Sequence, residues 1–495
     1  MQDGTATSNP TRTRFVVPIV LSSAGLGSSF FTSELTLTNS GANNVTLLFD
    51  YVSAFGGGSG QATDFLLPRQ QRIIPDAISY LRSLGIPIPD EGNRGGTLAV
   101  TFVGLGSPSG GAVTVRTTTE VGGGRAGLAY AGVTGSNRLS EPVYLCGLRQ
   151  NPSDRSNVAF QNVGGVTDGN VTLRISVYSG DSTVAIDLPD EILSPGEFRQ
   201  LTEILKPLGL SSGYAKVQRM AGTAPFYAYG VINDQNNSDG SFVAPTSAST
   251  AAPRRGFTIP VVVENSQFET EIILTNWSSA PKALRLDYVA ESIDTNDKTS
   301  RYSITLNAGA QVIVPSLVQF LRSNGSPGVG LKGLTYSGAL FVEAIDGDAS
   351  EVFGSARTSS LGAGGRFGLF YSGVPFGQGS SSSTWLFGLQ QNGESRTNLA
   401  IVNTGETDSS TDVFRVEIYD GTNGTFVTSA QFNVRARGWM QIGSIMANYA
   451  PNINQGYVRV TRTSGTNPFI TYAVINDGAT NLERTSDGAF VASSP

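Results

Sequence analysis

Internal repetition constrains this chain of 495 residues more than any other feature of its sequence. Residues 15–20 (FVVPIV) return as residues 257–262 (FTIPVV), and residues 33–39 (SELTLTN) return as residues 270–276 (TEIILTN). Three shorter matches share the same offset of about 240 residues: 81–83 with 321–323, 144–148 with 385–389, and 231–234 with 474–477. The chain is therefore a duplication of one half.

Each half is itself a weaker duplication, built from segments in which apolar and polar residues alternate. Four asparagines each end such a segment and open a turn: Asn39, Asn162, Asn276 and Asn403. A second alternating segment follows each turn, at residues 45–51, 171–177, 284–288 and 414–418. A period of two residues predicts β-strands with one buried face, so the chain holds four similar β units.

A short helical signal follows in each unit, at residues 75–85, 201–205, 317–321 and 442–446. The sequence thus predicts an all-β fold of four tandem Ig-like β-sandwich units, each with one short helix. The predicted units are residues 15–133, 142–246, 257–374 and 385–495, with a polar tail at 1–14 and a linker at 247–256. Four sandwiches in a row would make a rod.

Composition excludes several classes of function. The chain has no histidine and one cysteine, Cys146, so a Ser-His-Asp triad, a His-ligated zinc or haem and an internal disulfide are impossible. The net charge of −6 provides no basic surface, so we expect no nucleic-acid partner. No run of 18 apolar residues occurs, so we expect no transmembrane segment. Cys146 aligns with Phe387 in the second half, which indicates a core position.

A resemblance follows from the order of these motifs: an apolar run with a central proline (15–20 and 257–262), a T-x-L-x-L-x-N-like run (33–39 and 270–276), then a short helix. The chain resembles tandem Ig-like β-sandwich repeats of secreted bacterial proteins, and more narrowly a group from environmental bacteria. The resemblance implies a structural, adhesive or ligand-binding role outside the cell or at its surface, with any signal peptide already removed.

Clusters of oxygen-bearing side chains are candidates for a calcium site, because Ca²⁺ prefers carboxylate and amide oxygens at alternating positions of a loop. The first set is Asp234, Asn236, Ser238 and Asp239; the second is Asp346, Asp348 and Glu351; a third is Asp294, Asn296 and Asp297. The alternative for each set is a solvent-exposed turn. Calcium is the one cofactor that the sequence leaves open.

Trp277 is the candidate aromatic contact for a ligand. It lies in the turn after Asn276, where its counterparts are Ser40, Val163 and Thr404, so we expect it to be exposed. Residues 279–282 (SAPK) match the S-x-x-K pattern of some acyl enzymes, but they lie between two strands and contain a proline, which indicates a turn.

These observations favour an extracellular structural or adhesive scaffold and not an enzyme. Only five lysines are present to protect edge strands, so self-association into a filament or surface layer is expected. The predicted assembly strand is the first apolar run, with Phe15, Val16, Val17, Ile19, Val20 and Leu21. The first alternative is a module that binds carbohydrate or another cell-surface ligand through exposed aromatics; the second is a metal-dependent hydrolase.

Overall fold

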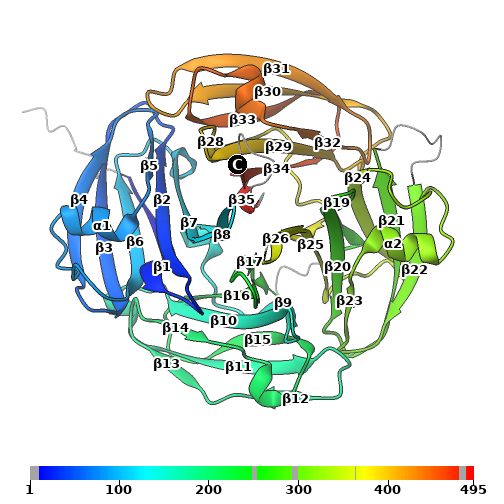
Figure 1. Ribbon diagram of the computed structural model, residues 1–495, viewed down its shortest axis with the longest axis horizontal. Helices are drawn as coiled ribbons and strands as arrows, with labels where there is room; N and C mark the ends of the chain where they lie inside the picture. The colour runs from blue at the N-terminus through cyan, green and yellow to red at the C-terminus, as the bar shows by residue number, and fades with distance from the viewer. Residues whose placement is uncertain (1–10, 248–253, 292–298, 363, 479–486, 495) are drawn as a thin grey trace, which may run out of the picture.

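The computed structural model describes residues 11–247, 254–291, 299–362, 364–478 and 487–494. Strands account for 59% of the residues and helices for 7%, which confirms the predicted all-β class. The strands form four sandwiches in sequence order, named units 1 to 4 below, and the four lie around a common centre (Figure 1).

Unit 1 shows the topology that the other units repeat. Its strands are β1 (Arg12–Ala24), β2 (Phe30–Asn39), β3 (Val45–Phe55), β4 (Gly60–Leu66), β5 (Gln71–Ile74), β6 (Arg94–Val103), β7 (Gly111–Val121) and β8 (Gly124–Ala131). The outer layer has the order β4-β3-β6-β1, and the inner layer contains β5, β2, β7 and β8. Strand β1 pairs with both β6 and β2, so it joins the two layers.

Unit 2 separates the two layers completely. Its strands are β9 (Val143–Arg149), β10 (Asp154–Asn162), β11 (Val171–Ser179), β12 (Ala185–Asp187), β13 (Glu191–Leu193), β14 (Phe198–Leu201), β15 (Ser212–Ala221), β16 (Phe226–Asp234), β17 (Gly240–Val243) and β18 (Thr246–Ser247). The inner layer is β14-β10-β16-β17.

Units 3 and 4 complete the second half. Unit 3 contains β19 (Gly256–Glu264), β20 (Phe268–Asn276), β21 (Lys282–Ala290), β22 (Thr299–Leu306), β23 (Gln311–Val314), β24 (Tyr336–Ala344), β25 (Val352–Gly362), β26 (Gly365–Ser372) and β27 (Val374–Pro375). Unit 4 contains β28 (Ser383–Gln390), β29 (Ser395–Asn403), β30 (Asp412–Asp420), β31 (Phe426–Val434), β32 (Trp439–Ile442), β33 (Gln455–Ser464), β34 (Phe469–Asp477) and β35 (Gly488–Ala492).

Alternation along the strands places one apolar face between the two layers of each unit. In β3, Val45, Leu47, Phe49 and Tyr51 are all buried in the core of unit 1, as the period of two predicted. The four expected asparagines behave alike too: Asn39, for example, accepts a hydrogen bond from Gly41 N and donates to two carbonyls, which fixes the turn after the strand.

Among the described residues, α-helices occur in three of the four units. They are α1 (Ala77–Ser83), α2 (Leu317–Ser323) and α3 (Ile445–Tyr449). Asp76 caps α1 by accepting from Ser79 N. The helix expected at 201–205 is wrong, because the described part of unit 2 has there only a turn and a 3₁₀ helix at Lys206–Leu208. Pro207 lacks the amide hydrogen that a longer helix would need.

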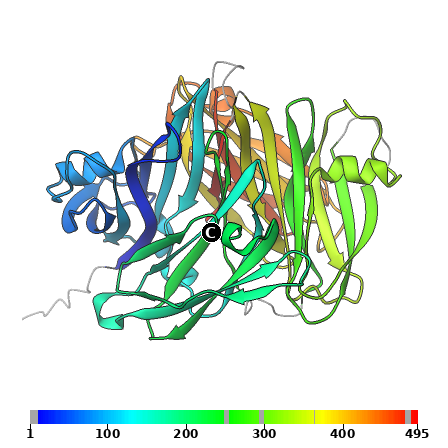
Figure 2. The ribbon, with the colours of Figure 1, turned by 60° about the horizontal axis from the view of Figure 1, so that its bottom comes forward.

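The units close into a ring instead of forming a rod. All four inner layers face the centre, where β8, β17, β26 and β35 are in contact. Unit 4 returns to unit 1, since Gly388 N donates to Gln71 Oε1 at 2.7 Å and Gln390 Nε2 donates to Glu34 Oε1 at 2.7 Å. Figure 2 shows the ring tilted, with unit 1 (blue) and unit 3 (green to yellow) on opposite sides. The rod expectation is therefore wrong.

Candidate functional site

The centre of the ring is held by aspartates that accept hydrogen bonds from backbone amides. Asp239 of unit 2 accepts from Gly127 N of unit 1 at 3.1 Å and from Gly368 N of unit 3 at 2.7 Å. Asp234 accepts from Arg366 N at 3.0 Å. One carboxylate thus ties together three units, and a charged acceptor makes these hydrogen bonds stronger than neutral ones.

The residues of the first predicted calcium set lie together in one turn, where they make hydrogen bonds within the turn and to other units. Asp234 Oδ1 accepts from Asn236 N at 2.8 Å, so Asn236 contributes its amide and its side chain is exposed. Ser238 is buried, with a positive φ of 62° that completes the turn. The described residues contain no group of three or more Asp, Glu, Cys or His arranged to hold a metal ion. Calcium binding stays an untested prediction.

The second predicted set surrounds an ammonium group. Lys282 Nζ lies 3.0 Å from Asp348 Oδ2 and 4.0 Å from Asp346 Oδ2. The Ser350 hydrogen bond and Lys282 lower the pKa of Asp348 to about 2. Glu351 is exposed, and its carbonyl oxygen accepts from Trp277 N. The third set, Asp294, Asn296 and Asp297, lies outside the described residues.

Trp277 is half-buried and not exposed as expected. Its ring stacks on Tyr144 of unit 2, with centroids 4.4 Å apart and planes inclined by 8°. It packs against the same apolar cluster as Cys146, which is buried as its alignment with Phe387 predicted. Burial raises the pKa of Cys146 to about 12, so the thiol is inert. The tryptophan belongs to the interface between units 2 and 3.

The predicted assembly strand is occupied within its own unit. Its residues form β1, which pairs antiparallel with β6, for example Val17 with Leu98. Phe15, Val16, Val17, Ile19 and Val20 are buried and Leu21 is half-buried. The expectation of a donated strand is wrong for this structure, because an apolar strand with two buried faces is satisfied by its own sandwich.

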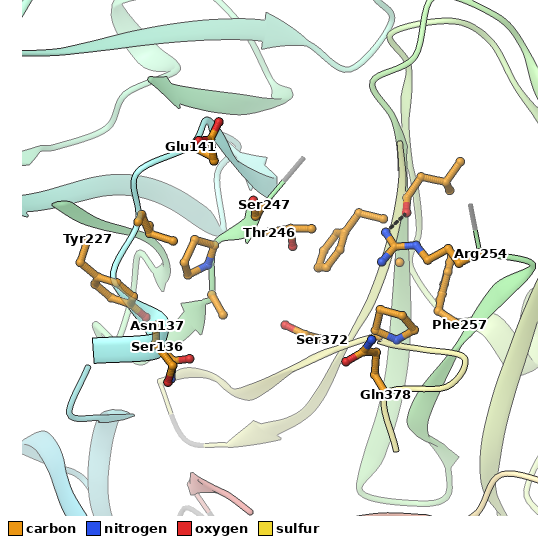
Figure 3. Close-up of a pocket in the computed structure, with 18 of the residues that line it drawn as sticks. Ser136, Asn137, Glu141, Tyr227, Thr246, Ser247, Arg254, Phe257, Ser372 and Gln378 are labelled. Carbon is orange, nitrogen blue, oxygen red and sulfur yellow. Dashed lines mark hydrogen bonds between the residues drawn. The ribbon is translucent and has the colours of Figure 1, made fainter. Parts of the chain in front are cut away.

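A cavity of about 660 Å³ opens where three inter-unit connections meet, and we call it the linker cavity. Its lining comes from the connection between units 1 and 2 (Ser136 to Glu141), from Ala244 to Ser247 and Arg254, and from Ser372, Gly373, Pro375 and Gln378. Figure 3 shows Tyr227 on one side and Arg254 on the other. Its volume falls in the range of small-molecule sites.

Arg254 is a charged residue of the linker cavity whose hydrogen-bonding capacity is only partly used. Its side chain donates to Val352 O at 3.2 Å (dashed in Figure 3), and its Nε has no hydrogen-bond partner. Burial lowers the pKa of Arg254. It forms no ion pair with any residue that the structure describes, so the guanidinium can bind an acidic group. Sequence reasoning missed Arg254, because neither repetition nor spacing distinguishes it from the neighbouring Arg255.

Comparisons with known proteins identify no family. No protein-family model and no curated protein matches the chain. Among solved structures, a crystal structure of Thermotoga maritima 1070 is similar over 26% of this chain and 98% of that chain, with 13% identity and a TM-score of 0.19. Similarity at that level carries no functional argument. In the described residues no helix is long and apolar enough to cross a membrane.

Proposed function

We propose that this chain is an extracellular, non-enzymatic binding scaffold whose ligand site is the linker cavity. The observation that carries the proposal is the position of Arg254 on the wall of a cavity of about 660 Å³, where its guanidinium has no carboxylate partner among the described residues. The location outside the cell rests on the resemblance to repeats of secreted bacterial proteins.

The lining favours a hydroxylated ligand that carries an acidic group. Hydroxyl and amide side chains of Ser136, Asn137, Ser372 and Gln378 can exchange hydrogen bonds with sugar hydroxyls, and Tyr227 supplies an aromatic surface. Arg254 would bind the acidic group through paired N–H donors. An acidic oligosaccharide has both features.

The test is an array of neutral and uronic-acid-containing oligosaccharides probed with the full chain. We expect binding to the acidic members only, and a loss of about ten-fold or more in Arg254→Gln. Arg255→Gln is the matched control, because Arg255 is exposed and pairs with Glu343 at 3.0 Å. Absence of binding to every oligosaccharide on the array, or an equal loss of binding in the two variants, would contradict the proposal.

A further inference from the structure

The duplication places two equivalent interfaces in the ring, between units 2 and 3 and between units 4 and 1. Both are anchored in the same way: Gln311 Oε1 accepts from Gly147 N at 2.7 Å, and Gln71 Oε1 accepts from Gly388 N at 2.7 Å. The two interfaces can therefore be compared residue by residue. A side chain that has its partners in one interface but not in the other marks a position where the two halves differ in their interactions.

Arg357, at the interface of units 2 and 3, is buried with its partners. Its side chain is 3% exposed. Its Nη1 donates to Asp154 Oδ1 at 3.0 Å, and its Nε donates to Ser241 Oγ at 2.9 Å. A buried guanidinium requires such acceptors, since an uncompensated charge in the interior is costly.

Arg116 is the counterpart of Arg357 in the first half, and it has lost both partners. Ser395 takes the place of Asp154, because Ser395 pairs with Asp477 as Asp154 pairs with Asp234. Ala489, next to Gly488, takes the place of Ser241, next to Gly240. Neither replacement offers a charged acceptor.

The Arg116 guanidinium nevertheless remains buried, with a side chain only 7% exposed. It donates no hydrogen bond to any residue that the structure describes, and its Nη2 is buried without a partner. The nearest carboxylate in an ion pair with it, that of Asp487, is 3.8 Å away, which is beyond hydrogen-bond distance.

A cavity of about 190 Å³ lies against the Arg116 side chain, and we call it the Arg116 cavity. It is lined by Phe30, Thr32, Glu34, Pro75, Arg116, Thr118, Glu120 and Arg125. A second difference between the two interfaces lies at the Arg116 cavity. Glu271 pairs with Arg149 at 2.6 Å in the other interface, whereas its counterpart Glu34 accepts from the neutral Gln390.

We propose that the Arg116 cavity binds a small carboxylate no larger than a free amino acid, whose oxygens accept from the Arg116 guanidinium as the Asp154 carboxylate accepts from Arg357. A carboxylate matches the two-pronged donor geometry of a guanidinium. Thr118 supplies a hydroxyl nearby, and Phe30, 48% exposed, supplies apolar surface for a short carbon chain. This site is independent of the linker cavity.

The test compares propionate with its neutral analogue propionamide, by isothermal titration calorimetry and thermal unfolding of the full chain at constant ionic strength. We expect saturable stabilisation by propionate, with an affinity at least about ten-fold above that for propionamide. Equal responses to the two compounds, or no response to either, would overturn the proposal.

The decisive variant is Ser395→Asp, which restores the carboxylate that the other interface has. We expect it to raise the Tm without ligand and to reduce propionate affinity about ten-fold or more, because the new carboxylate competes with the ligand for the Arg116 guanidinium. Ser429→Asp adds the same charge to an exposed position of the same unit and should change neither. Should Ser395→Asp not fold, Arg116→Gln must abolish the propionate response; full binding by either variant contradicts the proposal.

Discussion

The side chains of Asp239 of unit 2 and Asp487 of unit 4 are both buried at the centre of the ring, close enough for each carboxyl group to shift the pKa of the other. Two neighbouring buried carboxyl groups favour a state in which at least one carries a proton, because two like charges repel each other there. Burial raises the pKa of both above the usual value of 3.8, that of Asp239 to about 7, while Gly368 N, Gly127 N and Arg357 stabilise the charged form of Asp239.

This pair predicts that the protein loses stability as the pH rises from about 4 to about 7. Raised pKa values mean that the folded chain binds more protons than the unfolded chain in this interval, so the free energy of unfolding falls with increasing pH. We expect the Tm to fall by roughly 3–6 °C across it.

Asp487→Asn is close in shape to the natural side chain and removes one of the two titrating carboxyl groups, so Tm should depend less steeply on pH. Asp181→Asn is the control, because the hydrogen bonds of Ser179 and Thr183 lower the pKa of that exposed carboxyl to about 2, outside the interval. An unchanged slope in Asp487→Asn would show that other groups cause the dependence.

Glu271→Gln should weaken the interface between units 2 and 3. Glu271 and Arg149 form a two-pronged ion pair at 2.6 and 2.7 Å, with side chains 15% and 5% exposed. Removing one partner leaves a buried charge without compensation, which costs roughly 3–5 kcal/mol in urea-induced unfolding. Asp190→Asn, which breaks the exposed pair with Arg174, should leave stability unchanged within error. Equal effects would contradict this account.

Trp277→Ala should destabilise the fold, because the ring stacks on Tyr144 and closes the contact between units 2 and 3. We expect a loss of roughly 2–3 kcal/mol in chemical denaturation. Val166→Ala, at a position 89% exposed in unit 2, should have almost no effect. If Trp277 served only as a ligand contact, its removal would leave stability as unaffected as the control.

Val17→Asp distinguishes a structural β1 from a strand donated between molecules. Val17 is fully buried, so a carboxylate there should prevent folding of unit 1, seen as aggregated or protease-sensitive protein. Leu26→Asp, at a 59% exposed position, should remain folded. Light scattering that shows a folded monomer for Val17→Asp and an oligomer for the natural chain would restore the donated-strand hypothesis.

The sequence predicted what depends on short-range pattern. Alternation located strands such as β3, and the alignment of Cys146 with Phe387 located a core position. Ring closure could not be predicted, because it depends on polar side chains such as Gln71 and Asp239 that meet backbone amides of distant units. From sequence alone, an aspartate that accepts hydrogen bonds from two backbone amides cannot be distinguished from one that binds calcium.

Arg116 was detectable in principle. An alignment of the two halves shows that the arginine is present in both, while Asp154 becomes Ser395 and Ser241 becomes Ala489. A charged residue that both halves retain, while its hydrogen-bond acceptors are replaced in one half, indicates a different interaction in that half. Recognising those acceptors requires the register of β10 with β16 and of β29 with β34.

Strand β35, at residues 488–492, touches β8 of unit 1, and beyond it Ser494 exchanges two backbone hydrogen bonds with Trp385. Unit 4 is synthesised after unit 1, so this contact closes the ring late in folding. Until then the part of the unit 1 inner layer that contacts unit 4 stays exposed to solvent, and exposed apolar surface and strand edges of this kind favour aggregation of incompletely folded chains.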